Sequence, residues 1–296
     1  MIASRLRRLM ARLQWVRNYR KEREGRFPWT VRIPFVRDAI RREAHADWPG
    51  GTLFLQRDLM AYVPKPVDAI AGYRLLKPWR PSPYIEILCR AGDTVIDVGA
   101  NLGEWTLGAA LAVGPSGRVL AFEPVPHVAE ALARSVAINR FRWASVVAKA
   151  CADRAGEIDF SVERENTGGS RPGTIPSDAG RTFEHIRVSA VTLDSVVAAE
   201  RLARVDVIKI DVEGFEGVVL RGAVETLGRF KPALFLETGH ESREQRAALA
   251  DLCRGLGYRI AGVALGHGLA DAGWDDYLGQ SGAFAIGMAD MVLLAA

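Results

Sequence analysis

Short apolar segments alternate with helix-like segments between residues 94 and 261, and this order restricts the fold more than any other feature of the chain. Runs such as Val95-Ile96-Asp97-Val98 have the near-continuous apolar character of strands that are covered on both faces. Each run is followed by a segment with helical spacing of apolar residues. Strand, helix and strand in succession imply parallel strands joined by right-handed crossovers. We therefore expect one α/β domain with a mostly parallel sheet and helices on both faces.

The sheet is expected to contain seven strands, and two further strands are expected outside it. The seven cover residues 94–98, 118–122, 145–149, 205–211, 233–237, 258–261 and 291–295, with helices expected at 103–113, 127–139, 216–227 and 243–255. The two further strands, at 157–162 and 186–191, flank a loop at 166–180 that is dense in Gly, Ser and Pro. This loop is longer than is usual in compact domains, and we interpret it as a lid over a site.

Residues 1–90 are expected to form a basic N-terminal extension with a cap, beside a catalytic domain at 91–296. The first 45 residues hold thirteen Lys and Arg against four Asp and Glu, so their net charge is +9 and that of the remainder is −5. A mildly acidic core argues against nucleic acid as a partner. Segment 2–16 has the spacing of a basic amphipathic helix, which would either contact an anionic membrane surface peripherally or pack on protein.

The three cysteines predict a reducing, cytoplasmic location. Cys89, Cys151 and Cys253 are far apart and lack the spacing of disulfide or zinc frameworks. No apolar run reaches the roughly 18 residues of a membrane-spanning helix, and the N-terminus lacks the uninterrupted apolar segment of a secretory signal. His, Asp and Glu show no spacing that is diagnostic of a metal site, so no metal is expected.

The segment Asp97-Val-Gly-Ala-Asn-Leu-Gly103 follows an apolar strand and opens a helix, which is where open α/β sheets bind ligands. Gly99 permits a sharp turn and a close approach of the backbone. The helix that begins near Gly103 directs its free N–H groups toward a ligand. Asp97 is placed to order this loop and to meet the cationic amino group of an amino-acid moiety.

Glu123 ends the next strand, 20 residues after Gly103. An acidic residue at this offset accepts hydrogen bonds from both ribose hydroxyls of a nucleoside cofactor. A nicotinamide dinucleotide is the competing ligand, but its fingerprint G-x-G-x-x-G has a different glycine spacing. The turn instead resembles the D-x-G-x-N-x-G pattern of class I methyltransferases, in which Asn101 takes a position where glycine is also common.

The segment Lys209-Ile-Asp-Val-Glu-Gly214 places charged residues at the end of a buried strand. Lys209, Asp211 and Glu213 share one face because side chains alternate along a strand. Charges in a sheet interior are unfavourable unless they pair or meet a cleft. For Lys209 we expect a buried salt bridge with a carboxylate of a neighbouring strand, such as Glu237. For Asp211 and Glu213 we expect a role in the site.

Five motifs in this order resemble those of the FkbM-type methyltransferases: Asp97-Val-Gly-Ala-Asn-Leu-Gly, Phe122-Glu-Pro, Thr192-Leu-Asp-Ser, Lys209-Ile-Asp-Val-Glu-Gly-Phe-Glu and Phe235-Leu-Glu237. The resemblance covers residues 85–262 and the final strand. It implies the Rossmann-like fold of class I methyltransferases, S-adenosylmethionine as methyl donor, and O-methylation of hydroxyls on polyketide-like products, sugars or glycans. It also implies cofactor contacts: Asp97, Gly99 and Gly103 around the methionine part, Glu123 on the ribose, and Ala152 with Asp153 near the adenine.

Transfer of a methyl group to a hydroxyl calls for a general base, because the alcohol loses its proton as it attacks. Asp211, Glu213, Glu237 and His240 all fall at the carboxyl ends of adjacent expected strands. We favour Asp211 or Glu213 as the base, with His240 next. Two other functions stay as alternatives: an NAD(P)-dependent oxidoreductase, and a non-catalytic protein of this fold that docks on membranes through its N-terminus.

Removal of residues 1–26 is expected to leave the affinity for S-adenosylhomocysteine intact, because every cofactor motif lies beyond residue 90. The same truncation should abolish binding to anionic vesicles at low salt, since it removes the charge that attracts them. Calorimetry and vesicle cosedimentation measure the two effects. Equal vesicle binding by both proteins would contradict the membrane hypothesis, and loss of solubility would favour packing on protein.

Overall fold

The computed structural model describes residues 51–64, 82–164, 167–177, 182–265 and 268–295. The expected N-terminal helix at 2–16 lies outside the described residues, as do parts of the expected loop at 166–180. In the part of the chain that is described, no helix is both long enough and apolar enough to cross a membrane. Cys89, Cys151 and Cys253 are buried free thiols.

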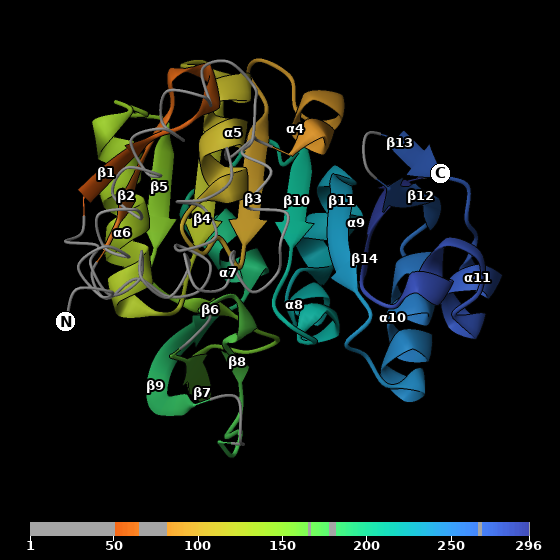
Figure 1. The fold of residues 1–296 in the computed structure, drawn as a ribbon. Coiled ribbons are helices and arrows are strands. Elements are labelled where there is room, and N and C mark those ends of the chain that lie inside the picture. Colours follow the sequence, from red (N-terminus) through yellow and green to blue (C-terminus); the bar gives the residue numbers. More distant parts are fainter. Residues whose placement is uncertain (1–50, 65–81, 165–166, 178–181, 266–267, 296) are drawn as a thin grey trace, which may run out of the picture.

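Eight strands form the central sheet, in the order β13-β12-β14-β11-β10-β3-β4-β5 (Figure 1). The strands from β11 to β5 pair in parallel, whereas β14 pairs antiparallel with both β11 and β12. The seven expected strands are present, and β13 is a short edge strand that the sequence pattern did not predict. The bounds are β3 Thr94–Val98, β4 Arg118–Phe122, β5 Ala144–Val147, β10 Val207–Ile210, β11 Ala233–Thr238, β12 Tyr258–Leu265, β13 Gly268–Ala270 and β14 Ala289–Ala295.

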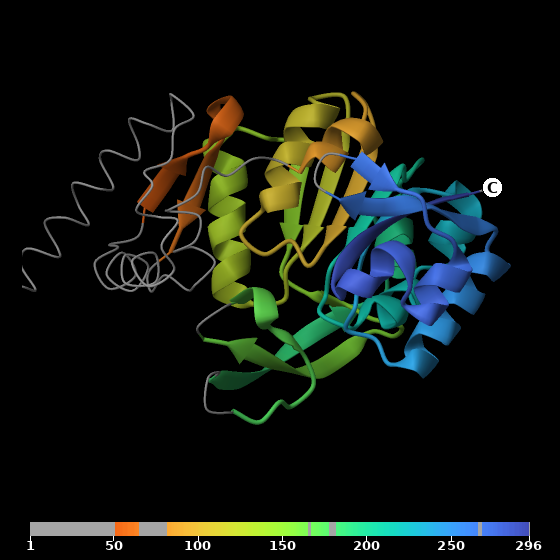
Figure 2. The same ribbon diagram turned by 45° about the vertical axis from the view of Figure 1, so that its right-hand side comes forward.

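Helices cover both faces of this sheet, as the alternation of strands and helices predicted (Figures 1 and 2). Side chains alternate along each strand, so Val95 packs with α4, α5 and α6, while its neighbour Ile96 packs with helices of the opposite face. The first face carries α4 Pro83–Leu88, α5 Glu104–Val113 and α6 Pro126–Ile138. The opposite face carries α7 Leu193–Ala199, α8 Glu216–Arg221, α9 Val224–Phe230 and α10 Arg243–Gly255, with α11 Trp274–Gly279 against α10.

The single helix expected at 216–227 is in fact two helices, α8 and α9, which separate at Gly222. A Cβ atom on Gly222 would lie 2.0 Å from the carbonyl oxygen of Ala152, so another segment touches the chain at the break. The Asp194 carboxylate then accepts hydrogen bonds from the N–H groups of Glu225 (3.1 Å) and Thr226 (2.8 Å), in the first turn of α9. Both contacts are remote in sequence, and helical spacing alone does not show them.

A second sheet, in the order β6-β9-β7-β8, lies beyond the carboxyl ends of the central strands (Figures 1 and 2). Its strands β7 and β9 are the two that the sequence predicted outside the central sheet, and they pair antiparallel along all of β7. A hairpin of β1 and β2 packs on α6. The bounds are β1 Gly51–Phe54, β2 Met60–Val63, β6 Ala150–Cys151, β7 Gly156–Glu163, β8 Arg171–Pro172 and β9 Phe183–Val191.

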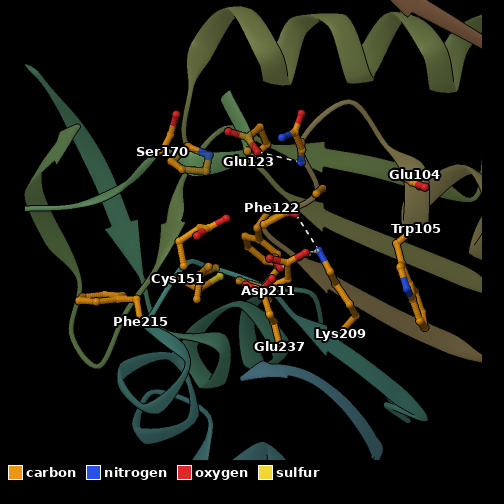
Figure 3. Close-up of a pocket in the computed structure, with 18 of the residues that line it drawn as sticks. Glu104, Trp105, Phe122, Glu123, Cys151, Ser170, Lys209, Asp211, Phe215 and Glu237 are labelled. Atoms are coloured by element: carbon orange, nitrogen blue, oxygen red, sulfur yellow. Dashed lines mark hydrogen bonds and ion pairs between the residues drawn. The ribbon is translucent and has the colours of Figure 1, made fainter. Parts of the chain in front are cut away.

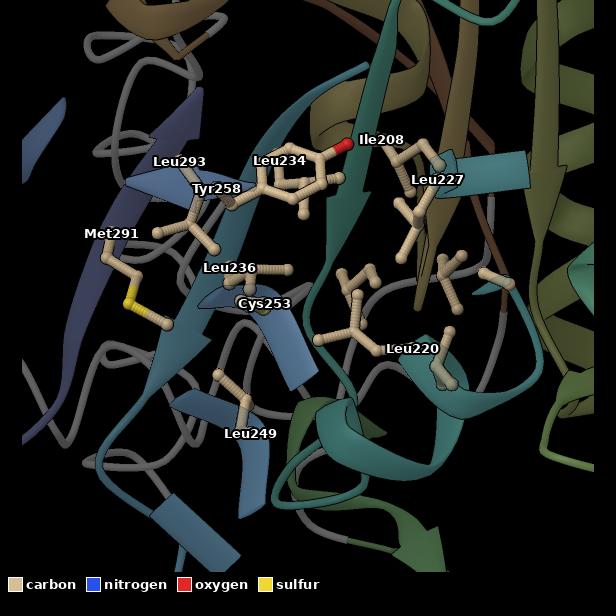
Figure 4. Packing of buried hydrophobic residues seen from close by; sticks show 14 of the residues in the cluster. Ile208, Leu220, Leu227, Leu234, Leu236, Leu249, Cys253, Tyr258, Met291 and Leu293 are labelled. Carbon is tan, nitrogen blue, oxygen red and sulfur yellow. The ribbon is translucent and has the colours of Figure 1, made fainter. Parts of the chain in front are cut away.

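The core beneath α7 to α10 holds β10 and β11 in place (Figure 4). Ile208, Leu234 and Leu236 of these strands have essentially no exposed surface, and Leu220 of α8 and Leu249 of α10 belong to the same cluster. Burying one side chain of this size contributes roughly 1.5–3 kcal/mol. The residues that follow β10 and β11 are therefore carried on a rigid frame.

The order of the strands reverses between β3 and β10. The chain runs from β3 outward through β4 and β5, and then returns to β10, which lies next to β3 on the side away from β4. Open α/β sheets bind ligands at such a point. The loops after β3 and β10 touch here, because a Cβ atom on Gly99 would lie 1.8 Å from the carbonyl oxygen of Asp211. Gly99 allows a close approach of backbone, as expected, and the segment that approaches it is the loop after β10 of the same chain.

Gly99→Ala is expected to lower the free energy of unfolding by about 3 kcal/mol, because a φ of +77° strains alanine and its methyl group would overlap Asp211. Gly228→Ala in α9 is the matched control. Nothing lies within 4 Å of a Cβ atom there, so this change should stabilise by about 0.5–1 kcal/mol. Urea unfolding measures both, and parental stability in Gly99→Ala would show that the two loops are free to separate.

Candidate active site

A cavity of about 680 Å³ opens between the carboxyl ends of the central strands and the small sheet (Figure 3). Its volume is in the range of sites that enclose small ligands. Residues from the expected lid border it beside the small sheet, which supports the interpretation of that loop as part of a site. The cavity is lined at one end by Gly99, Asn101 and Glu123, at the other by Asp211, Glu213 and Glu237, and beside the small sheet by Phe160, Thr167 and Ser170.

Glu123 lies just after β4 with 6% of its surface exposed. Its Oε2 accepts a hydrogen bond from the N–H of Asn101 and its Oε1 accepts one from the N–H of Val125, both at 2.9 Å. Burial raises the pKa of Glu123 to about 7, although the two hydrogen bonds act in the opposite direction. Each carboxylate oxygen keeps further acceptor capacity. Glu123 can therefore bind hydroxyl groups in the cavity while it fixes the loop after β3.

Lys209 is buried in β10 and pairs with Asp97 of β3, not with Glu237 as expected. Its Nζ lies 3.2 Å from Asp97 Oδ1 and 3.4 Å from Asp211 Oδ2, and it donates to the carbonyl oxygen of Gly99 at 2.8 Å. Burial lowers the pKa of Lys209, but the two aspartates outweigh burial and hold the pKa above its ordinary value. The expected buried salt bridge with a carboxylate of a neighbouring strand is confirmed. Only the example Glu237 was wrong, because the register of β10 on β3 places Lys209 opposite Asp97.

Asp97 has no exposed surface and is not part of the cavity wall. Its Oδ2 accepts a hydrogen bond from Thr106 Oγ1 at 2.6 Å, and its Oδ1 faces Lys209. The expected contact with a cationic amino group does not fit this position, because the ammonium group of Lys209 already occupies it. Asp97 instead orders the site indirectly, through Lys209 and the first turn of α5.

The glycine loop after β3 combines cavity contact with packing. Gly99 and Asn101 line the cavity, and Asn101 has a φ of +46° with its Oδ1 accepting from the N–H of Leu102 at 2.7 Å. Gly103 has a φ of +92°, and a Cβ atom on it would lie 2.4 Å from Leu132 Cδ1 of α6. Gly103 therefore serves the packing of α5 on α6, and its expected contact with the cofactor stays a prediction.

The two residues expected near an adenine ring lie just beyond the cavity wall. Ala152 is 3% exposed, and Asp153 Oδ2 lies 3.5 Å from Nη2 of Arg221 on the outside of α8. The wall at this point is formed by the two residues of β6, which directly precede Ala152. A ring bound here would contact β6 first.

The four candidates for the base meet at the other end of the cavity. Asp211, Glu213 and Glu237 line it, and Figure 3 shows Asp211 and Glu237 together beside Lys209. His240 Nε2 lies 3.2 Å from Glu213 Oε2 and 3.7 Å from Glu237 Oε2. Burial raises the pKa of Glu213 to about 7, and burial together with Asp211 and Glu213 raises that of Glu237 to about 10. The expectation that these strand ends converge is confirmed.

The turn after β10 holds Glu213 in a left-handed backbone conformation, with a φ of +56°. Glu216 supports this turn, since its Oε1 accepts from the N–H groups of Val212 (3.1 Å) and Gly214 (3.2 Å). A Cβ atom on Gly214 would lie 3.3 Å from Cβ of His240, so the turns after β10 and β11 approach closely. A left-handed non-glycine residue costs of order 1–3 kcal/mol and persists where its surroundings fix it.

Two acidic residues at this end were not predicted. Asp290 lies opposite Glu237 in the pairing of β14 with β11 and lines the cavity, and burial raises its pKa to about 6. The last strand was expected to begin at residue 291, so Asp290 fell outside it. Glu216 is 1% exposed, although a glutamate in the first turn of a helix is normally on the surface. Tertiary packing buries it, and no local pattern signals this.

Residues 97–260, more than half of the chain, match the family model described as the methyltransferase FkbM domain. The chain belongs to the FkbM methyltransferase family. The matched segment contains β3, β4, β10 and β11 with the loop that carries Glu123. It also contains Asp211, Glu213, Glu237 and His240, the residues at the acidic end of the cavity. The resemblance in the sequence motifs is thereby confirmed, and S-adenosylmethionine is the cofactor.

Two curated relatives are similar in sequence. The 31-O-demethyl-FK506 methyltransferase FkbM of Streptomyces tacrolimicus is 34% identical over 158 residues, and the match covers 45% of this chain and 60% of that protein. The 2-O-methyltransferase NoeI of Sinorhizobium fredii (strain NBRC 101917 / NGR234) is 24% identical over 200 residues, and the match covers 64% of this chain and 76% of that protein. The match to the Streptomyces protein thus spans less than two thirds of its length.

Solved methyltransferase structures are similar at low sequence identity. The methyltransferase FkbM from Methylobacillus flagellatus KT is 16% identical with a TM-score of 0.42, over 90% of this chain and 60% of that chain. An S-adenosylmethionine-dependent O-methyltransferase from Thermotoga maritima is 14% identical with a TM-score of 0.40, over 86% and 81%. Because both scores lie below 0.5, the Rossmann-like fold of the class I methyltransferases is assigned from the sheet order and the family match.

Glu123→Ala is expected to weaken S-adenosylhomocysteine binding by about 1.5–3 kcal/mol, the scale of hydrogen bonds to a charged group. It should also lower the free energy of unfolding by about 1–3 kcal/mol, because the N–H groups of Asn101 and Val125 lose their acceptor. Since the pKa of Glu123 is raised to about 7, binding by the parent should weaken as the pH falls below 7 and the carboxylate takes up a proton.

Glu130→Ala is the control for this experiment, because Glu130 is exposed on α6 and pairs only with Arg134 across one helical turn. It should change neither quantity by more than about 0.5 kcal/mol. Calorimetry and urea unfolding provide the two readouts. Parental affinity in Glu123→Ala would show that the ribose is bound elsewhere.

Proposed function

We propose that this FkbM-family protein transfers a methyl group from S-adenosylmethionine to a hydroxyl group of a sugar, a glycan, a polyketide or a related natural product. The observation that carries the proposal is the position of Asp211, which follows β10 and lines the same cavity as Glu123 and Glu237. Methylation of an alcohol needs a proton acceptor of this kind beside the donor. The names of both curated relatives specify an oxygen atom as the methylated position.

The donor is proposed to bind at the Glu123 end of the cavity. Glu123 presents its carboxylate to the ribose hydroxyls. Gly99 and Asn101 border the methionine part next to the first turn of α5, whose free N–H groups favour its carboxylate. The residues of β6 border the adenine ring, in place of Ala152 and Asp153. Buried acceptor atoms, a backbone anion site and an apolar wall in one cavity fit the parts of S-adenosylmethionine.

S-adenosylmethionine supplies an electrophilic methyl group. The chain has to hold the acceptor oxygen in line with the methyl carbon and the sulfur, and to remove a proton. The hydroxyl proton passes to the carboxylate of Asp211. The electron pair left on oxygen forms the new C–O bond, and the electrons of the broken S–C bond stay on sulfur.

Asp211 suits the role of base better than its neighbours. Its side chain is 42% exposed, and Lys209 Nζ, 3.4 Å away, fixes its orientation. Burial and the neighbouring Asp211 and Glu213 raise the pKa of Glu237 to about 10, which makes its carboxyl group less suited to this role. Glu213, with its pKa raised to about 7, is the second candidate, and His240 is the third.

For the N-terminal part we propose a basic extension and cap at 1–90 beside the methyltransferase domain at 91–296. The described pieces of residues 1–90 are α4 and the hairpin of β1 and β2. The hairpin is held on α6 by three hydrogen bonds, one of which Asn139 Nδ2 donates to the carbonyl oxygen of Met60 at 2.6 Å. Asn139 Oδ1 accepts from the N–H of Met60 at 2.9 Å, and Ser135 Oγ accepts from the N–H of Tyr62 at 2.8 Å. Peripheral contact of the extension with an anionic membrane, from a cytoplasmic location, stays a prediction from its charge.

Calorimetric titration with S-adenosylhomocysteine and with NADPH tests this function against its alternatives. A methyltransferase binds the first ligand tightly, an oxidoreductase binds the second, and a non-catalytic protein needs neither. Tight binding of NADPH alone would refute the proposal. The acceptor is then sought among sugar and polyketide hydroxyls with the parent enzyme.

Asp211→Asn keeps the shape of the side chain and deletes its basicity, so kcat on a true acceptor should fall roughly 10²–10⁴-fold while donor affinity changes little. Glu213→Gln is measured in parallel and should have the smaller effect. Asp159→Asn is the matched control, because Asp159 is exposed on β7 and pairs only loosely with Arg187. If Asp211→Asn and Glu213→Gln both keep parental rates, the strand-end carboxylates are structural.

A further inference from the structure

We propose that Glu213, Glu237 and His240 bind a divalent transition-metal ion at the acidic end of the cavity. The sequence predicted no metal, because the three residues follow two different strands and have no metal-site spacing. In the fold, one carboxylate or imidazole atom from each lies within 4.8 Å of the other two. The role given to the ion below rests on the proposed function, whereas the binding site itself does not.

The distances between the three side chains suit one shared ion. His240 Nε2 is 3.2 Å from Glu213 Oε2 and 3.7 Å from Glu237 Oε2. Ligand atoms at about 2.1 Å from one ion are roughly 3.0 Å apart at right angles and roughly 4.2 Å apart across it. An ion therefore fits between these atoms with small rotations of the side chains. Glu237 lies in β11, and the turns that carry Glu213 and His240 already approach closely at Gly214.

Two of the three ligand atoms are buried without a hydrogen-bond partner among the described residues. They are Glu237 Oε2 and His240 Nε2. A third buried oxygen without a partner, Oε2 of Glu216, belongs to a side chain that is 1% exposed and whose charge acts on Glu237. Buried polar atoms in native proteins almost always bind protein, water or an ion. These unused lone pairs point to a ligand at the cluster.

Among the described residues, little positive charge faces this end of the cavity. Asp211 and Asp290 line it, and Glu163 acts on it from β7. The cations that the described residues bring to it are Lys209, which is already engaged by two aspartates, and Arg171 of β8. Carboxylates this close repel one another, and a cation placed among them relieves that repulsion. A divalent ion is such a cation.

Two carboxylate oxygens and one imidazole nitrogen suit first-row transition ions such as Mn²⁺ or Zn²⁺, whereas Mg²⁺ and Ca²⁺ prefer oxygen ligands alone. Three protein ligands leave further coordination positions for water or for an acceptor hydroxyl, as in catalytic metal sites. An ion held here would polarise the O–H bond of an acceptor beside Asp211 and ease removal of its proton. It would also orient the acceptor relative to the donor.

Titration of the chelator-treated full-length protein with MnCl₂ tests the site. We expect one Mn²⁺ per chain, measured by loss of the electron paramagnetic resonance signal of the free ion, and a rise in unfolding temperature on binding. Glu237→Gln and His240→Ala should each weaken Mn²⁺ binding by about tenfold or more. Glu184→Gln removes an exposed carboxylate of β9 and is the matched control, for which parental binding is expected.

S-adenosylhomocysteine is titrated into the same samples, so that the two proposals fail separately. Tight binding of this ligand with no bound Mn²⁺ or Zn²⁺ overturns the metal site and leaves the methyltransferase function intact. If the parent binds Mn²⁺ and both variants lose this binding, the metal site is supported even when no methyl acceptor is found. Equal Mn²⁺ affinity in the parent and both variants overturns the assignment of ligands. Glu213→Gln replaces either variant that circular dichroism shows to be unfolded.

Discussion

The buried ammonium group of Lys209 is the interaction on which the site depends. It lies between Asp97 of β3 and Asp211 after β10, and it donates to the carbonyl oxygen of Gly99. Taking such a charge out of water costs several kcal/mol, and breaking a buried pair by removal of one partner typically costs about 3–5 kcal/mol. The three acceptors together offset that cost. The contact therefore fixes the distance between the loops after β3 and β10, and that distance shapes the cavity.

The two ends of the cavity have different origins. The end around Glu123 is built from β3, β4 and α5, which are consecutive in the chain and supported by the main core. The acidic end draws on the turns after β10 and β11, on β14 and on the small sheet, which are far apart in sequence. The family match runs from 97 to 260 and leaves out β14 with Asp290. Asp290 therefore lies beyond the matched segment, whereas Asp211, Glu213 and Glu237 of the same end lie within it.

The sequence predicted the elements well because strand and helix periodicities are local. It also predicted that Asp211, Glu213, Glu237 and His240 would converge, since the carboxyl ends of parallel strands share one edge. The errors concern register and packing. The partner of Lys209 depends on how β10 pairs with β3, and the need for glycine at Gly103 comes from a side chain of α6. Neither is written in any short segment, and the proposed metal ligands, which come from β11 and two turns, have no spacing to detect.

The position of β14 has a consequence for how the site is assembled during synthesis. β14 follows β11 and β12 in the chain, yet it lies between them in the sheet and pairs with both. Until it emerges, β11 and β12 each present an open edge, the kind of surface that invites pairing with other chains. Thr238 and Asp290 cannot reach their final places earlier, since Thr238 Oγ1 donates to the carbonyl oxygen of Ala289 on β14. The acidic end of the cavity is thus a late product of folding, and a ribosome-bound chain that still lacks β14 can have a formed donor end but no completed acceptor end.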